Sequence, residues 1–443
     1  MLFTTWNFWL FLVVVLAAFY LSPRPSRRYI LLAASLFFYM CWRPYFVLLL
    51  LALITIDFFA AQWIESRTGR PRHLALLLSL IANLGFLAYF KYANFFLAGL
   101  HYFDVILPLG ISFHTFQSIS YVVDVYRGKQ PAIRNYTDYA LYVAFFPQLV
   151  AGPIVRARNF FDDLFHWQPP THDEFQRGVT QAVFGLAKKL ICADQFAQIA
   201  DQYFNAPVPG YLPAWTGALA FALQIYFDFS GYTDIAIGTA LLFGFHFPEN
   251  FRRPYLAASI TDFWHRWHIS LSSWLRDYLY IPLGGNREGT LNTYRNLLIT
   301  MVLGGLWHGA SWNFVVWGAY HGILLSVERA IFGKRDQPAL LRPLMTILTF
   351  TMVTIGWVFF RAKTLPAAAY TIHEMLQPIR GQSLFAPWHW RLAALTLCIA
   401  IFKENFDRPL APNLRAPAIV LMLLAIELFG VTDRHLPFVY FQF

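Results

Sequence analysis

Charged residues are scarce in this sequence. Asp, Glu, Lys and Arg make up 13% of its 443 residues, whereas 58% are hydrophobic and 19% are aromatic. Soluble domains carry roughly 25% charged residues, so this composition predicts a polytopic membrane protein. The long apolar runs exclude a transmembrane β-barrel, whose strands alternate over short segments. We therefore expect an all-α protein that crosses the membrane several times.

Cysteine and the common catalytic motifs are rare or missing. Cys41, Cys192 and Cys398 lie in separate apolar segments, so we expect neither a disulfide framework nor a thiolate metal site. His265 and His268 have HxxH spacing without an HExxH pattern, and we predict no metal site. The sequence has no GxSxG elbow, CxxC pair, P-loop or GxGxxG fingerprint, so serine-nucleophile, dithiol and nucleotide-hydrolysing chemistry lack their usual signals.

The basic residues lie in short segments between apolar runs. A net charge of +10 would suggest nucleic acid in a soluble chain, but this distribution is the positive-inside signal of a membrane protein. Arginine clusters at residues 24–28 and 67–72 alternate with the single Arg43 between successive spans. We expect both clusters to be cytoplasmic, no nucleic-acid partner, and a retained first span, Trp6–Leu21, with its N-terminus outside.

Apolar runs predict the helices and a single domain. The expected spans and buried helices are residues 6–21, 29–42, 46–63, 74–90, 107–128, 135–150, 178–204, 215–245, 343–360, 392–402 and 418–431. Segment 107–128 is too polar to face lipid and is expected against the protein interior, while segment 160–177 is expected to be a polar loop. We predict one membrane domain over residues 1–443, with a motif-bearing core from about residue 108 to 329.

The stretch Leu297–Leu325 holds the strongest functional candidate. It contains no charged residue, yet it is too long for one ordinary span and is interrupted by glycines at 304, 305 and 309. At a rise of about 1.5 Å per residue, His308 lies roughly 16 Å from Leu297, about half a hydrocarbon core. A histidine at that depth is expected to face the protein interior or a water-filled cavity. The alternative is a packing histidine bonded to a neighbouring helix.

Residues 261–289 hold a second histidine. We expect one amphipathic helix that begins at Thr261 and ends at Pro282, with a polar stripe on one side and His268 on the apolar side. Such a helix is too charged to span lipid, so it should lie at the interface or line a cavity.

Polar side chains in another apolar run add to these histidines. Gln224 and Asp228 lie four residues apart and share a helix face. They face either the same interior as His308 or a packing partner on a neighbouring helix. A neutral imidazole can take the proton of an alcohol as it attacks an activated acyl group, and acyl transfer needs little else beyond positioning and charge stabilisation. Acyl transfer is therefore a chemistry that these residue types can support.

Five segments resemble one protein family. They are FFPQLVAGPIVRARNF, YFDFSGYTDIAIG, FHFPENFRRPY, DFWHRWHISLSSWLRDYLYIPLGGNREG and LGGLWHGASWNFVVWGAYHG. They resemble membrane-bound O-acyltransferases (MBOAT), in particular the branch of the alginate O-acetylation membrane protein, which is also similar to the D-alanine transfer protein of teichoic acid modification. The resemblance covers Pro108 to about Arg329 by motif and the remainder by hydropathy.

The resemblance implies a fold and a reaction. The fold would be an all-α bundle with re-entrant or broken helices around a central funnel, where a cytoplasmic acyl donor meets an acceptor from the opposite side. The donor would be acetyl-CoA or an acyl-carrier thioester, with no bound cofactor. The acceptor would be a polysaccharide hydroxyl or an acyl carrier on an extracytoplasmic partner protein. The expected location is the bacterial cytoplasmic (inner) membrane.

The resemblance also assigns site residues. His308 corresponds to the family's near-universal histidine and would act as general base, and His268 would orient the acyl group or stabilise charge on the thioester oxygen. The weaker substrate-binding candidates are Asn313, Asp228, Gln224, Trp267, Arg276 and Asp277. A ping-pong route through His308, the acyl chain length and the acceptor stay open. The alternative function is a transporter or flippase, or a scaffold subunit of a polysaccharide-export complex.

Overall fold

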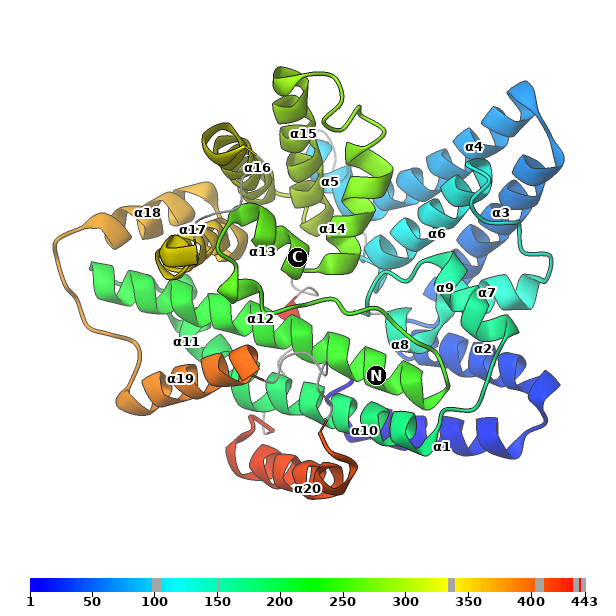
Figure 1. The fold of residues 1–443 in the computed structure, drawn as a ribbon, viewed down its shortest axis with the longest axis horizontal. Coiled ribbons are helices and arrows are strands. Elements are labelled where there is room, and N and C mark those ends of the chain that lie inside the picture. Colours follow the sequence, from blue (N-terminus) through cyan, green and yellow to red (C-terminus); the bar gives the residue numbers. More distant parts are fainter. Residues whose placement is uncertain (98–105, 150–151, 334–338, 403–409, 433–437, 440–443) are drawn as a thin grey trace. The chain divides into compact units, whose positions relative to one another are not determined.

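The protein is helical throughout the part of the chain that the structure describes. The computed structural model describes residues 1–97, 106–149, 152–333, 339–402, 410–432 and 438–439 (Figure 1). The chain forms two compact units: unit 1 comprises Met1–Ala182 and Tyr232–Pro248, and unit 2 comprises Val183–Gly231 and Glu249–Phe443. The helical content confirms the expected all-α class, and the single membrane domain stays a prediction.

Unit 1 begins with four helices close to the expected spans. Its elements are α1 (Trp6–Leu21), α2 (Arg24–Met40), α3 (Phe46–Ser66), α4 (Gly69–Leu87), the π-helix η1 (Ala88–Tyr92), α5 (Ala93–Phe96), α6 (Ile111–Tyr126), α7 (Tyr136–Ala144), α8 (Phe146–Leu149), α9 (Ala157–Phe165) and most of α10 (His172–Ala187). Helix α6 packs against α3 and α4, and its residues 111–122 are all buried. The polar segment 107–128 therefore lies against protein, as predicted.

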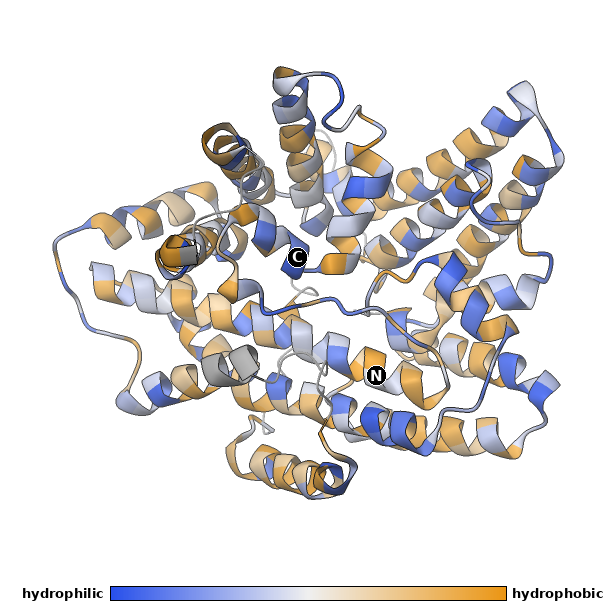
Figure 2. Ribbon diagram, in the orientation of Figure 1, coloured by the Kyte–Doolittle hydropathy of each residue, from blue (hydrophilic) through white to orange (hydrophobic). Residues whose placement is uncertain are grey.

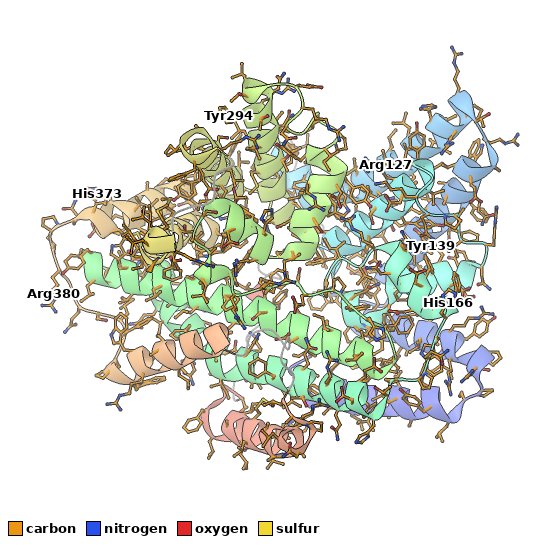
Figure 3. The ribbon with its side chains drawn as sticks, in the orientation of Figure 1. Arg127, Tyr139, His166, Tyr294, His373 and Arg380 are labelled. Atoms are coloured by element: carbon orange, nitrogen blue, oxygen red, sulfur yellow. The ribbon has the colours of Figure 1, made fainter. Side chains whose placement is uncertain are left out.

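One fully buried carboxylate of unit 1, that of Asp57, is satisfied by hydrogen bonds. Asp57 of α3 accepts hydrogen bonds from Ser79 Oγ at 2.6 Å and from Asn83 Nδ2 at 2.8 Å, both on α4. Tyr139, labelled in Figure 3, is fully buried, and its ring centroid lies 4.6 Å from that of Tyr121. These contacts join α3 to α4 and α6 to α7 without leaving a buried carboxylate unsatisfied.

The polar segment 160–177 differs from its prediction. It was expected to be a loop, but it contains most of α9 and the start of α10, and only residues 166–171 lie between them. Helix α9 forms because Phe160 and Phe161 give it a buried face. Helix α10 starts after a capping box, in which Thr171 Oγ1 accepts the Glu174 N–H and Glu174 accepts the Thr171 N–H.

Unit 2 carries the remaining helices. Its elements are the π-helix η2 (Lys188–Ala193), α11 (Asp194–Asn205), most of α12 (Tyr211–Leu242), the 3₁₀-helix η3 (Pro254–Leu256), α13 (Ile260–Arg266), α14 (Ile269–Leu275), the π-helix η4 (Arg276–Tyr280), α15 (Thr290–His308), α16 (Trp312–Phe332), the 3₁₀-helix η5 (Ala339–Leu341), α17 (Arg342–Arg361), α18 (Leu365–Leu376), α19 (Pro387–Phe402) and α20 (Pro412–Phe429). Helix α18 was not predicted; its N-cap Thr364 accepts the Ala367 N–H.

Several helices have the length and composition of membrane spans. Within the described ranges, four helical stretches are long and apolar enough to cross a bilayer: Phe46–Ser66, Gly69–Phe96, Arg342–Arg361 and Pro412–Phe429. Helix α1 is as apolar but shorter. Hydrophobic residues recur along α3, α4 and α20 (Figure 2). The fold thus agrees with the predicted polytopic membrane protein.

A buried charge cluster sits where η2 meets α11 and α12. The Nζ of Lys189 lies 2.5 Å from Asp194 Oδ1 and 2.7 Å from Asp228 Oδ1, and all three side chains are 2% exposed. The Oδ2 of Asp228 also accepts the N–H of Val439 at 2.6 Å. Asp228 is therefore engaged by an ammonium group and by the backbone near the end of the chain.

Candidate active site

His308 is the last residue of α15. Gly309 has an extended backbone conformation that ends the helix, and α16 begins three residues later at Trp312. The imidazole is 5% exposed, and its ring centroid lies 5.0 Å from Trp307, 5.1 Å from Trp317 and 5.1 Å from Phe360. The predicted irregularity at this point is thus a helix break that presents His308 at a helix end inside an aromatic shell.

Glycines bring α15 and α16 together around this break. A Cβ atom at Gly305 would collide with the carbonyl oxygen of Phe314, and one at Gly309 would collide with the Phe314 ring. Gly304 and Gly305 were expected to interrupt the helix, but both lie inside α15. Their role is close helix packing, and only Gly309 marks an interruption in this hairpin.

His268 lies at a second helix break. The single helix predicted from Thr261 to Pro282 is wrong: α13 ends at Arg266, α14 begins at Ile269, and the continuation is a π-helix. His268 has φ of 43° and ψ of 55°, a left-handed conformation that costs a non-glycine residue about 1–2 kcal/mol. Such local strain concentrates at functional sites. The helix start also differs, because Ser259, not Thr261, is the N-cap of α13.

The segment around Asn250 holds this break in place. The Arg252 N–H donates to the carbonyl of Arg266 at 2.9 Å, and the Ile269 N–H donates to the carbonyl of Asn250 at 2.8 Å. The side-chain oxygen of Asn250 accepts the Ser270 N–H at 3.1 Å and lies 3.2 Å from His268 Nδ1. Asn250 was not among the predicted site residues, although it lies in FHFPENFRRPY, one of the segments that resembled the family.

In the structure, both histidines lie next to the indole ring of Trp307. His268 is fully buried, and its ring centroid lies 6.0 Å from that of Trp307, which in turn lies 5.0 Å from His308. Phe229 of α12 packs edge-on against the His268 ring at 4.6 Å. Two histidines forty residues apart in the sequence thus share one buried aromatic neighbourhood of unit 2.

Trp267 and Asn313 are held by contacts within unit 2. Trp267 is 1% exposed, and its ring centroid lies 4.8 Å from Trp357 and 5.1 Å from Phe251. The Nδ2 of Asn313 donates to the carbonyl of Ala362 at 2.6 Å. Both side chains contribute to packing, and a substrate contact by either stays a prediction.

The other weaker candidates differ in how fully they are engaged. Gln224 is 6% exposed, and among the described residues no donor reaches its Oε1 atom. Asp228 belongs to the charge cluster with Lys189. Arg276 Nε donates to Asp277 Oδ1 at 2.8 Å, with side chains 59% and 34% exposed. Gln224 therefore has hydrogen-bonding capacity left for a ligand.

The described part of the chain contains no group of three or more His, Cys, Asp or Glu side chains that could hold a metal ion. His265, which shares the HxxH spacing, is exposed on α13, whereas His268 is buried. The break between α13 and α14 thus separates the environments of the two histidines.

Comparison with known proteins gives these residues a family context. Residues 130–365 match the membrane-bound O-acyltransferase (MBOAT) family. The chain belongs to this family. It is 43% identical to the "Probable alginate O-acetylase AlgI" of Pseudomonas putida, over 96% of this chain and 86% of that protein. It is 48% identical to the protein of the same name from Azotobacter vinelandii, over 81% of this chain and 74% of that one. It is 40% identical to the "Peptidoglycan O-acetyltransferase" of Helicobacter pylori, over 84% and 77%.

Family membership confirms the resemblance seen in the sequence. The protein is an O-acyltransferase of a membrane-bound family, so the transporter, flippase and inactive-scaffold alternatives are set aside. The matched region contains both helix breaks, with His268 and His308. The roles of individual residues are argued next.

Proposed function

We propose that this O-acyltransferase moves an acetyl group from a cytoplasmic thioester across the membrane to a hydroxyl of an extracytoplasmic polysaccharide, or to an acyl carrier on a partner protein. Two relatives named as an alginate O-acetylase and a peptidoglycan O-acetyltransferase support the acetyl group and the polysaccharide acceptor. The donor is acetyl-CoA or an acyl-carrier thioester, and the partner is an extracytoplasmic acetyltransferase. The site of action is the bacterial inner membrane.

The observation that carries this proposal is the pair of buried histidines around Trp307. His308 is 5% exposed and His268 is fully buried, and polar side chains buried in a membrane protein commonly mark a substrate pathway. The aromatic shell of Trp317 and Phe360 around His308 keeps bulk water from the ring. Exclusion of water favours transfer of the acyl group to an alcohol over hydrolysis of the thioester.

In the proposed reaction His308 is the general base. Its unprotonated ring nitrogen takes the proton of the attacking hydroxyl while the oxygen bonds to the carbonyl carbon of the thioester. The carbon–sulfur bond then breaks, and the leaving thiolate takes the proton back from the imidazolium. His268 orients the acyl group or stabilises the charge that develops on the thioester oxygen.

Donor and acceptor can be tested on the purified protein in nanodiscs. We expect release of free thiol from acetyl-CoA to be faster than from butyryl-CoA or octanoyl-CoA, and to rise when a polyuronate or a peptidoglycan fragment is added. A burst of thiol without acceptor indicates the ping-pong route. If no thioester is consumed with either acceptor, even when the extracytoplasmic partner is supplied, the proposed donor is wrong.

A further inference from the structure

The side-chain oxygen of Asn250 can be identified from its neighbours. It accepts the backbone N–H of Ser270 at 3.1 Å, and a backbone N–H can only donate, so the atom at this position is the oxygen and not the nitrogen of the amide. The Ser270 Oγ lies 2.8 Å from the same atom. Two contacts from Ser270 therefore fix the orientation of the Asn250 amide.

This orientation determines the tautomer of His268. His268 Nδ1 lies 3.2 Å from the Asn250 oxygen, which accepts but cannot donate. Nδ1 must therefore carry the hydrogen, and in the neutral ring Nε2 must carry the lone pair. The neutral imidazole of His268 is thus an acceptor at Nε2.

Asn250 also fixes the backbone that carries this ring. Its carbonyl accepts the N–H of Ile269 at 2.8 Å, directly after His268, whose φ of 43° is unfavourable for a residue with a Cβ atom. The carbonyl of His268 accepts the N–H of Ser272 at 2.9 Å. One residue therefore restrains both the strained backbone at position 268 and its imidazole, and all of these groups belong to unit 2.

We propose that Asn250 is a positioning residue of the active site, which holds His268 in the Nδ1–H tautomer so that neutral His268 accepts a hydrogen bond at Nε2. Its importance for turnover rests on the proposed function. In this tautomer His268 orients a substrate hydroxyl or amide N–H, and it cannot donate from Nε2 to the thioester oxygen without first being protonated. The neutral ring therefore does not stabilise charge on the thioester oxygen, and it orients the substrate through a hydroxyl or amide N–H, because the acetyl group itself has no donor.

The tautomer can be read directly by NMR on ¹⁵N-histidine-labelled protein in nanodiscs. The signals of His268 are identified as those lost in His268→Gln. We expect wild type to show protonated Nδ1 and unprotonated Nε2. Asn250→Asp keeps an acceptor at the same place and is expected to keep this pattern. Asn250→Ala removes the acceptor, so the ring is expected to lose its preference for a proton on Nδ1. Asn296→Ala is the control, because Asn296 is fully buried but donates to the carbonyl of Gly285.

Activity supplies the second readout. Asn250→Ala is expected to lower kcat for acetyl transfer by about ten- to a hundred-fold, by analogy with the loss of a group that orients a metal-ligating histidine, and Asn250→Asp is expected to restore most of it. A wild-type spectrum with protonated Nε2 overturns the proposal, even if Asn250→Ala does not fold. Unchanged kcat in Asn250→Ala overturns it as well. If the NMR spectra are as expected but neither the wild type nor any variant transfers acetyl groups, the proposed function fails and the tautomer assignment stands.

Discussion

Replacing Lys189 with methionine removes the ammonium group from the buried charge cluster. Its Nζ lies 2.5 Å from Asp194 and 2.7 Å from Asp228, and all three side chains are 2% exposed. Two carboxylates are then left without this cation in a water-poor interior, and breaking a buried ion pair in this way costs about 3–5 kcal/mol. This free energy is the penalty for leaving two buried carboxylates without a counter-ion, and it differs from the net contribution of the cluster to stability.

Asp228→Asn is the matched variant in the same cluster. Lys189 keeps Asp194, and the new amide oxygen can still accept the Val439 N–H that lies 2.6 Å from Asp228. The variant loses one carboxylate and keeps a neutral ion pair, so we expect it to cost about 1–2 kcal/mol, less than Lys189→Met. If Asp228→Asn folds but loses most of its acetyl transfer, Asp228 contacts the substrate in addition to its structural role.

The assay is thermal unfolding in nanodiscs, followed by tryptophan fluorescence and circular dichroism. We expect Lys189→Met to unfold at the lowest temperature and Asp228→Asn at an intermediate one. Neutralising both carboxylates in the Lys189→Met background should recover part of the loss, because no buried anion then remains in the cluster. If Lys189→Met unfolds at the wild-type temperature, the reasoning about this cluster is refuted.

Three further predictions concern other parts of the chain. Gly305→Val should destabilise the protein by about 1–3 kcal/mol, because the new side chain collides with the Phe314 carbonyl. Gly85→Ala is the control and should not destabilise it, because no atom lies within 4 Å of its Cβ position. The two variants are compared by their unfolding temperatures. The Asp163 carboxylate raises the pKa of His246. The pair therefore stabilises the folded protein, by less than about 1 kcal/mol because both side chains are partly exposed. This stabilisation is complete below about pH 6.5 and is lost as the pH rises through the raised pKa of folded His246. Unfolding temperatures of wild type and Asp163→Asn across this range should converge at high pH. Gln224→Leu should leave stability unchanged or higher while raising KM for the acceptor, and an unchanged KM would remove Gln224 from the substrate site.

Hydropathy was sufficient to predict the span-like helices. Helix α1 matches its predicted residues, and α3 and α17 extend only a few residues beyond theirs, because long apolar runs have few alternatives in a bilayer. The helix end at His308 was also signalled, since a glycine follows a polar residue in the middle of an apolar stretch. Both histidines were singled out by their positions in these stretches, and the family resemblance assigned their roles.

The break at His268 could not be read from periodicity. The sequence from Thr261 to Pro282 has a helical pattern, and the interruption comes from the segment of Asn250 to Arg252, whose backbone bonds with Arg266 and Ile269 replace helical ones. Such tertiary hydrogen bonds override local propensity. The role of Lys189 was also missed. Its two carboxylate partners lie on different helices, and the sequence does not show that these helices are side by side.

Acetyl transfer by His308→Ala tests the central claim most directly. Wild type, His308→Ala and His246→Ala are compared in nanodiscs with acetyl-CoA and acceptor, after thermal unfolding has shown that all three are folded; His246 is an exposed histidine of unit 1. The account predicts that His308→Ala loses about 10²- to 10⁴-fold in rate, the usual contribution of a general base, and that His246→Ala keeps the wild-type rate. Equal rates for wild type and His308→Ala would contradict it.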